Sequence, residues 1–350
     1  MAGPRMINEP TNRPLNRRPP EYHARHAARV AQILQDLNQA GKTLKRSDVK
    51  LCENYAIDVF RHKAFTPWLL AYTAVSGNFK EGWIPDNFYG EKVVPEIQGP
   101  YGRMSLLKSM SPAVLNSPSF PDLAMQINGT LFDRAYEHLS FDEARKRLFE
   151  HADHIVFKAD GSGQGKSIHF LDQDSFNRET VARLGSGVFQ RRIQQHAFFQ
   201  AFSGAAVAAV RITTVVEPTG KISPRAAYMC LPIGSDTHVQ GSSRIRMPVD
   251  LSNGALAEIA LDARWLECLA HPTSGETFAG KKIPAFKACV RTVIAHHQRI
   301  AFVGSVGWDV VVDSDGEVQI LEWNGFHNGI GFSEATQGPC FADLGWERFA

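Results

Sequence analysis

Apolar residues recur with helical spacing in the first third of the chain. Four of them lie three or four residues apart: Val30, Ile33, Leu34 and Leu37. This stripe predicts a helix over 21–46. A second helix is predicted after Ser47, and a third over 66–75, where a proline stands in the first turn. Residues 76–125 are rich in Gly and Pro and predict loops and short elements.

The second part of the chain favours strands. A helix predicted over 139–152 opens with Ser140 and Glu143, the spacing of a capping box. Beyond it, short runs of β-branched and aromatic residues between turn residues predict strands. These runs are 154–159, 167–171, 187–193, 206–216, 225–233 and 243–251. A helix is predicted over 284–300, and the turn Asp-Ser-Asp-Gly within 306–324 predicts a β-hairpin.

Composition narrows the class of protein. The chain has 350 residues, 43% of them hydrophobic and 21% charged, which indicates a globular protein of two or three domains. Its formal net charge of +2 does not favour nucleic acid or a membrane surface as a partner. The five cysteines are scattered and form no CxxC pair, which favours reduced thiols in the cytoplasm and argues against a zinc site.

The hydropathy pattern predicts neither a membrane span nor a signal peptide. No apolar run reaches the ~18 residues that a membrane helix needs. Residues 1–20 are basic and proline-rich, lack an apolar core, and are expected to be a disordered arm.

The hairpin at 306–324 carries candidate metal ligands. Asp309 begins one strand, and Glu322 and Asn324 end the other. Glu322 and Asn324 are two residues apart and therefore share a face of the sheet, and the hairpin brings Asp309 opposite them. Two carboxylates and an amide oxygen are ligands that suit Mg²⁺. A polar outer face with a capped strand end is the alternative.

A glycine-rich loop follows Lys158. It differs from a Walker loop because Asp160 stands where the first glycine is required, and because a strand follows it where a Walker loop has a helix. Such a loop, with a lysine before it, can lay backbone N–H groups and one positive charge over a polyphosphate. A plain turn beside a surface lysine is the alternative.

Together these two elements resemble the ATP-grasp superfamily, and the hairpin is similar to the metal-binding hairpin of D-alanine–D-alanine ligases. The closer resemblance is to the sugar-transfer-associated ATP-grasp group, and it covers roughly 50–335. The stretches that carry it are "PWLLAYTAVSGNFKEGWIPDNFY" (67–89), "QRRIQQH" (190–196), "VRITT" (210–214), "HPTSGETFAGKKIPAF" (271–286) and "VGWDVVV" (306–312).

The resemblance implies an α/β chain with an ATP-grasp fold, made of an α+β lid subdomain, a larger C-terminal α/β domain and a helical N-terminal region. The expected division is a basic arm, a helical region, a small lid with the glycine-rich flap, and a C-terminal domain with the metal hairpin. The corresponding ranges are 1–20, 21–110, 111–187 and 188–350.

The resemblance also implies roles for single residues. ATP would be bound by Lys108, Lys158, Gly161, Ser162, Gly163, Gly165, Gln190, Arg191, Arg192 and Ile193. One or two Mg²⁺ ions would be held by Asp309, Glu322 and Asn324. Lys158 and Arg211 would act on the transferred phosphoryl group. An anionic substrate would meet Arg244, Arg246 and His271, each of which also has an ordinary structural interpretation.

By this resemblance the chain is an ADP-forming ligase. It would use ATP and Mg²⁺ to activate a small-molecule carboxylate as an acyl phosphate and join it to an amine, hydroxyl or thiol, with polysaccharide biosynthesis as the expected context. One departure weakens this hypothesis: the ligases have an arginine where this chain has Gly307, a position that Arg211 would have to serve. A kinase that phosphorylates a hydroxyl and a non-catalytic nucleotide-binding module are the alternatives.

Overall fold

The computed structural model describes residues 21–162, 167–204, 206–234 and 244–350. The expected arm at 1–20 lies outside these ranges, as do Gly163 and Gly165 of the glycine-rich loop.

The N-terminal region is helical, as predicted. Its elements are α1 (Tyr22–Gln39), α2 (Arg46–Asp58), η1 (Lys63–Phe65), α3 (Thr66–Ser76), α4 (Asp86–Phe88), η2 (Tyr89–Val93), α5 (Val94–Gln98), η3 (Tyr101–Leu106), η4 (Lys108–Met110) and α6 (Ser111–Leu115). The apolar stripe of α1 buries Val30, Ile33 and Leu37. The prediction of one helix to residue 46 was wrong, because the chain turns at Gly41, whose φ of 85° is a left-handed conformation that favours glycine.

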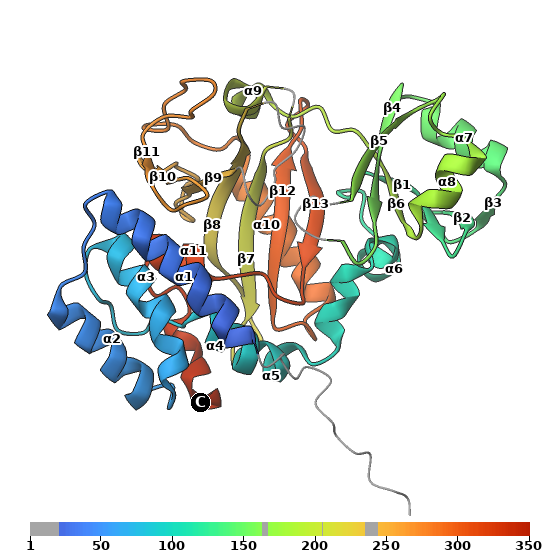
Figure 1. Cartoon of the computed structure of the whole chain (residues 1–350). Coiled ribbons are helices and arrows are strands. Elements are labelled where there is room, and N and C mark those ends of the chain that lie inside the picture. The colour runs from blue at the N-terminus through green and yellow to red at the C-terminus, as the bar shows by residue number, and fades with distance from the viewer. Residues whose placement is uncertain (1–20, 163–166, 205, 235–243) are drawn as a thin grey trace, which may run out of the picture.

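A smaller antiparallel sheet follows, at the right of Figure 1. Its strands are β1 (Asp122–Ile127), β2 (Thr130–Asp133), β3 (His138–Leu139), β4 (His154–Ala159), β5 (Ile168–Asp172) and β6 (Gly187–Arg191). They lie in the order β3-β2-β1-β6-β4-β5, and helices α7 (Phe141–Phe149) and α8 (Arg178–Leu184) accompany them. The predicted capping box of Ser140 and Glu143 opens α7. Because β6 belongs to this sheet, we propose that the small domain extends to Arg191.

A larger antiparallel sheet forms the centre of the molecule (Figure 1). Its strands are β7 (Ala209–Val216), β8 (Ile222–Pro232), β9 (Arg244–Pro248), β10 (Ala260–Leu261), β11 (Glu267–Cys268), β12 (Ser305–Val312) and β13 (Val318–Asn324). Their order is β11-β10-β9-β8-β7-β12-β13. Helix α9 (Ala197–Ser203) lies between β6 and this sheet in the chain, and α10 (Phe286–Arg299) contacts β7, β8 and β12.

The C-terminal segment returns to the N-terminal helices. It contains α11 (Gly331–Gln337), η5 (Ala342–Leu344) and η6 (Trp346–Phe349). Phe332 and Trp346 share one apolar core with Trp68 of α3. The carboxylate of Glu334, fully buried, accepts hydrogen bonds from the backbone N–H groups of Ile84 and Cys340, both at 2.7 Å. Both ends of the described chain therefore build one helical unit, which packs beside β8 and β9.

None of the described helices is both long and apolar enough to serve as a membrane span.

Candidate active site

The hairpin of β12 and β13 places two carboxylates side by side. Asp309 pairs directly with Glu322 across the two strands, which confirms the expected juxtaposition, and Asn324 pairs with Gly307. The register shifts after Asp309, so Leu321 has no partner in the ladder. Such a bulge changes the direction of neighbouring side chains, and both Leu321 and Glu322 line the cavity described below.

Arg211 of β7 forms a two-pronged ion pair with Asp309. Its Nε and Nη2 atoms donate to the two carboxylate oxygens at 2.6 and 2.8 Å, and its Nη1 donates to the backbone oxygen of Asn328 at 3.2 Å. The two residues are also direct partners in the ladder between β7 and β12. Burial opposes the charge of Arg211, but Asp309 outweighs it and raises the pKa of the guanidinium well above its usual value.

Gly307 makes room for this arginine. A Cβ atom at Gly307 would lie 3.2 Å from Cδ and Nη1 of Arg211 and 2.8 Å from Cβ of Asn328. A side chain at position 307 would therefore clash with Asn328 and crowd the arginine that β7 supplies. The departure from the ligase pattern noted in the sequence thus has a physical reason.

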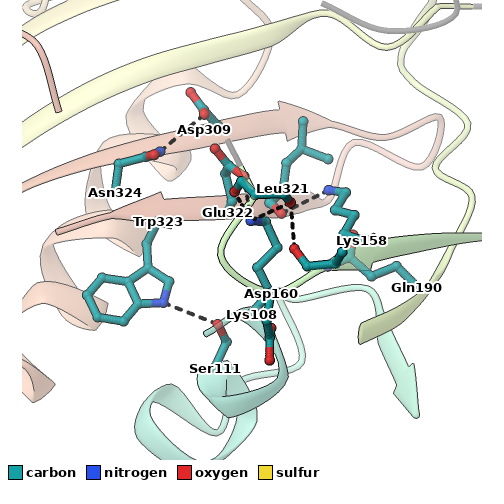
Figure 2. A network of polar contacts seen from close by, with 12 residues as sticks. Lys108, Ser111, Lys158, Asp160, Gln190, Asp309, Leu321, Glu322, Trp323 and Asn324 are labelled. Carbon is teal, nitrogen blue, oxygen red and sulfur yellow. Dashed lines mark hydrogen bonds and ion pairs between the residues drawn. The ribbon is translucent and has the colours of Figure 1, made fainter. Parts of the chain in front are cut away.

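Two lysines also approach the hairpin, at Leu321 and Glu322 (Figure 2). Lys158 of β4 donates from Nζ to the backbone oxygen of Leu321 at 3.0 Å. Lys108 donates to the backbone oxygen of Ser162 at 2.6 Å, and its Nζ lies 4.0 Å from the Glu322 carboxylate. Burial lowers the pKa of Lys158 below its usual value, although Glu322 favours the charged form.

The segment between the two sheets follows Arg191, and Gln190 lies in β6 just before it. The side chain of Gln190 is buried and donates to Asp122 of β1 at 2.7 Å, its direct partner across the ladder. Burial raises the pKa of Asp122 to about 6, although the bond from Gln190 opposes this rise. Arg191 and Arg192 are exposed, and β6 ends at Arg191. The predicted strand over 187–193 is therefore two residues too long.

One cavity of about 410 Å³ collects most of the predicted site residues. Its lining includes Lys108, Lys158, Ser162, Gln190, Arg191, Arg192, Ile193, Arg211, Arg244, Arg246, Asp309, Glu322 and Asn324. Gly161 is outside the lining, and its N–H donates to the backbone oxygen of Leu106 at 2.7 Å. His271 is outside it too: the ring is buried, with Nε2 2.9 Å from the backbone oxygen of Pro232 and Nδ1 3.2 Å from the hydroxyl of Ser274.

The cavity also has a wall that the sequence reasoning missed. Its residues come from α1, α3, α4 and the segments around β11 and α11: His26, Arg29, Trp68, Asp86, Trp265, Asn328 and Phe332. Trp68 lies inside a stretch that resembles the sugar-transfer-associated group, but the resemblance implied no role for this residue. Arg29 lies on the polar side of α1, where periodicity alone predicts solvent exposure.

The donor set at the hairpin fits a hard divalent cation. Asp309 and Glu322 supply carboxylate oxygens. The amide nitrogen of Asn324 donates to the backbone oxygen of Gly307 at 3.3 Å and to the carboxylate of Asp309 at 3.4 Å. Neither of these bonds uses the amide oxygen of Asn324. Among the described residues no group of three or more His, Cys, Asp or Glu side chains could hold a metal ion by itself. A cation here would therefore also need oxygens from a phosphate or water.

Two antiparallel sheets joined by a short hinge define the ATP-grasp class of fold, and here Lys158 of the smaller sheet and Lys108 of η4 are directed at the hairpin of the larger sheet that carries Asp309 and Glu322. The sequence profile of the sugar-transfer associated ATP-grasp family matches residues 146–343. The chain belongs to this family, as the sequence resemblance implied. No curated protein matches it in sequence.

Several solved structures have a similar arrangement. The ATP-grasp ligase PsnB with its minimal precursor is 13% identical, with a TM-score of 0.41 over 71% of this chain and 63% of PsnB. Biotin carboxylase from Campylobacter jejuni is 13% identical, with a TM-score of 0.42 over 70% of this chain and 48% of that one. D-cycloserine synthetase DcsG is 16% identical, with a TM-score of 0.42 over 73% of each chain. The chain thus spans less than two thirds of the length of the first two.

Proposed function

We propose that this protein is an ATP- and Mg²⁺-dependent, ADP-forming ligase. It would activate a small-molecule carboxylate as an acyl phosphate and join it to an amine, hydroxyl or thiol. The observation that carries the proposal is the convergence of Asp309, Glu322, Arg211 and Lys158 on one cavity between the two sheets. The family's association with sugar transfer supports polysaccharide assembly as the context.

ATP would lie between the small sheet and the hairpin. Lys158 and Lys108 would contact its phosphates, since both Nζ atoms are directed at the edge of β13 where Leu321 and Glu322 lie. The backbone at Gln190 to Ile193 would read the edge of the adenine, because this segment joins the sheets and lines the cavity. Ser162, which lines the cavity, would cover the phosphates.

The carboxylates of Asp309 and Glu322 and the amide of Asn324 would hold Mg²⁺. That ion would neutralise phosphate charge and orient the γ-phosphoryl group. Arg211 would steady the transferred group: its three bonds use three of five N–H donors, which leaves two for a ligand.

The proposed reaction balances in two steps. An oxygen of the substrate carboxylate attacks the γ-phosphorus, the bond from that phosphorus to the bridging oxygen breaks, and ADP leaves with the electron pair. The acceptor then attacks the carbonyl carbon of the acyl phosphate, loses its proton, and inorganic phosphate leaves. No side chain of the protein is covalently modified. Lys158 and Arg211 act by electrostatic stabilisation of the charge that spreads over the phosphoryl oxygens.

A hydroxylamine trap tests the proposal. The protein is incubated with Mg²⁺, ATP, hydroxylamine and a pool of amino acids, uronic acids and small carboxylic acids, and ADP and hydroxamate are measured together. We expect both products in equal amounts, because hydroxylamine intercepts the acyl phosphate. Glu322→Gln should keep the fold and lose at least ~100-fold of the rate, since it removes a charged metal ligand.

The controls separate the possible outcomes. Glu179→Gln, at an exposed position on α8, should leave the rate unchanged. Equal product formation by Glu322→Gln and the wild type would contradict the metal site. ADP without hydroxamate would indicate transfer to a hydroxyl and would overturn the ligase proposal in favour of a kinase.

A further inference from the structure

The side chains that line the cavity carry an excess of positive charge. Eight Lys or Arg side chains line it, against three carboxylates. Asp309 and Glu322 lie together at the hairpin. The third carboxylate, Asp86, accepts hydrogen bonds at Oδ1 from the N–H groups of Ile330 (2.8 Å) and Gly331 (3.2 Å). A nucleotide with its magnesium would offset only part of this positive excess.

Arg246 is a buried cation without a carboxylate partner in the described chain. The residue is 5% exposed, and its guanidinium carbon Cζ lies 5.0 Å from the centre of the Trp265 ring and 4.4 Å from the centre of the Phe332 ring. Its Nε has no hydrogen-bond acceptor among the described residues. Burial, and then the nearby charge of Arg244, lower its pKa to about 9. Burying an unpaired guanidinium is costly, so this environment favours an anionic ligand.

Two further arginines lie at the same end of the cavity. Arg244 is two residues before Arg246 on β9 and therefore shares its face of the sheet. Arg29 of α1 lies 5.6 Å over the ring of Trp68, and that ring is 6.0 Å from Trp265, on which Arg246 rests. None of the three arginines has a carboxylate within 4.0 Å in the described part of the chain.

His26 adds a neutral donor to this end. The indole N–H of Trp68 donates to its Nδ1 at 2.9 Å, which leaves the imidazole proton on Nε2. Burial lowers the pKa of His26 to about 4, although Asp86 opposes this shift, so the ring is neutral at pH 7. It lines the cavity and can donate to an acceptor without adding charge.

The strand order places this cationic end at a defined distance from the reacting centre. Arg246 is on β9, and Arg211 is on β7, with β8 between them. Neighbouring strands are about 4.8 Å apart, so the two positions are separated by roughly 10 Å across the sheet. A ligand that contacts both positions in the sheet must therefore extend across this distance.

We propose that the acid substrate carries a second anionic group, which Arg246, Arg244 and Arg29 bind about two strand spacings from Arg211. This inference rests on the proposed function and names its substrate class: an acid with a carboxylate or phosphate at the far end of an extended molecule. The N-terminal helical unit then completes the acid-binding pocket by supplying Arg29.

Matched pairs of acids test this inference by calorimetry in the presence of Mg²⁺ and a non-hydrolysable ATP analogue. Suberate is compared with octanoate, and 6-phosphogluconate with gluconate, so that each pair differs in its second anionic group. In at least one pair, we expect the acid with the second anionic group to bind at least ~10-fold more tightly than the acid without it. The pair that shows the difference distinguishes a carboxylate from a phosphate.

Variants assign the difference to the arginines. Arg246→Met, which keeps most of the side-chain volume, and Arg244→Met should each reduce the preference at least ~5-fold, and Arg183→Met on the exposed face of α8 should keep it. Affinity for the ATP analogue should stay unchanged in all three. Equal affinities within both pairs, or a preference that survives both substitutions on β9, would overturn the inference and leave the ligase proposal intact. Failure of the wild type to bind the ATP analogue would overturn both.

Discussion

Arg211 determines the geometry of the candidate site. A guanidinium can bond both oxygens of one carboxylate and still offer N–H groups to a third partner, whereas a lysine is a single point of charge. Here Nε and Nη2 bond Asp309, and Nη1 bonds the backbone of Asn328. The arginine thus fixes the orientation of the carboxylate that we propose as a metal ligand.

Lys158 is expected to lower the stability of the fold and to strengthen the binding of ATP. Burial lowers its pKa, so the folded protein disfavours the charged amine more than the unfolded chain does. The unfolded state therefore binds the proton more tightly, and near pH 7 the charge lowers the free energy of unfolding. We expect Lys158→Met to raise the free energy of unfolding in urea at pH 7 and to weaken the binding of an ATP analogue at least ~10-fold.

Lys146→Met on α7 is the control for this variant, because that lysine lies outside the cavity lining. It should change neither quantity. A Lys158→Met protein that binds the nucleotide as tightly as the wild type would remove Lys158 from the phosphate site.

Some functional side chains could be found from the sequence and others could not. Asp309 and Glu322 were predictable as neighbours because a local hairpin joins them, but their direct pairing depends on the bulge at Leu321, which the sequence did not indicate. The bond from Arg211 to Asp309 joins strands that are distant in the sequence, and no local pattern records such a pairing. Arg29 is exposed, as its place on the polar side of α1 predicts, and only the tertiary packing puts this exposed side chain at the cavity.

At the scale of elements, one buried pair of side chains lies where the hinge begins. Asp122 of β1 holds Gln190 of β6 just before the chain leaves the small sheet. The second carboxylate oxygen of Asp122 has no hydrogen-bond partner among the described residues. Burial of this carboxylate makes ionisation unfavourable, which gives the hinge a dependence on pH.

The sign of that dependence follows from the pKa of Asp122. Burial raises it from 3.8 to about 6, so the folded state binds the proton more tightly than the unfolded chain. The stabilisation is fully present below pH ~4 and is lost as the pH rises through about 6. Asp122→Asn can still accept the bond from Gln190. We expect it to raise the free energy of unfolding at pH 7 by on the order of 2 kcal/mol relative to the wild type, with little gain at pH 4.

Urea unfolding at both pH values measures this effect. Asp174→Asn, in the loop after β5, is the matched control and should show the same small difference at both values. A constant offset between Asp122→Asn and the wild type from pH 4 to pH 7 would show that Asp122 ionises normally in the fold.

The type of each long element was predictable, but its ends were less so. The hydrophobic stripe on α1 buries its residues as expected, yet it did not mark the end of the helix, which depends on the left-handed turn at Gly41. The strand beginning at Gly187 stops at Arg191 because the chain there leaves the small sheet. The ends of these elements depend on contacts with residues that are distant in the sequence, which a local pattern does not contain.

At the scale of the whole molecule, the two ends of the described chain together form one wall of the cavity. The sequence indicated a helical N-terminal region, but not that the last helices would share its core. Trp83 donates from its indole N–H to the backbone oxygen of Glu334 at 2.8 Å, and Phe332 lies in the same apolar cluster as Trp68. The sequence of either segment shows that it has an apolar face to bury, but it does not show which other segment will cover that face.

This association gives the last prediction. Asp86 of α4 accepts through Oδ1 from the backbone N–H groups of Ile330 and Gly331, all in a buried setting. Asp86→Ala leaves two buried donors without an acceptor, and we expect it to lower the free energy of unfolding by about 2–4 kcal/mol. Asp86→Asn keeps an oxygen at the same position and should cost about 1 kcal/mol.

Urea unfolding gives both free energies, and hydrogen exchange at the two amides locates the effect. Exchange at Ile330 and Gly331 should accelerate strongly in Asp86→Ala and only slightly in Asp86→Asn, because an amide exchanges when its hydrogen bond opens. Equal losses of stability in the two variants would mean that the charge of Asp86 matters more than its acceptor oxygen. The link between the helical unit and the C-terminal segment would then be mainly electrostatic.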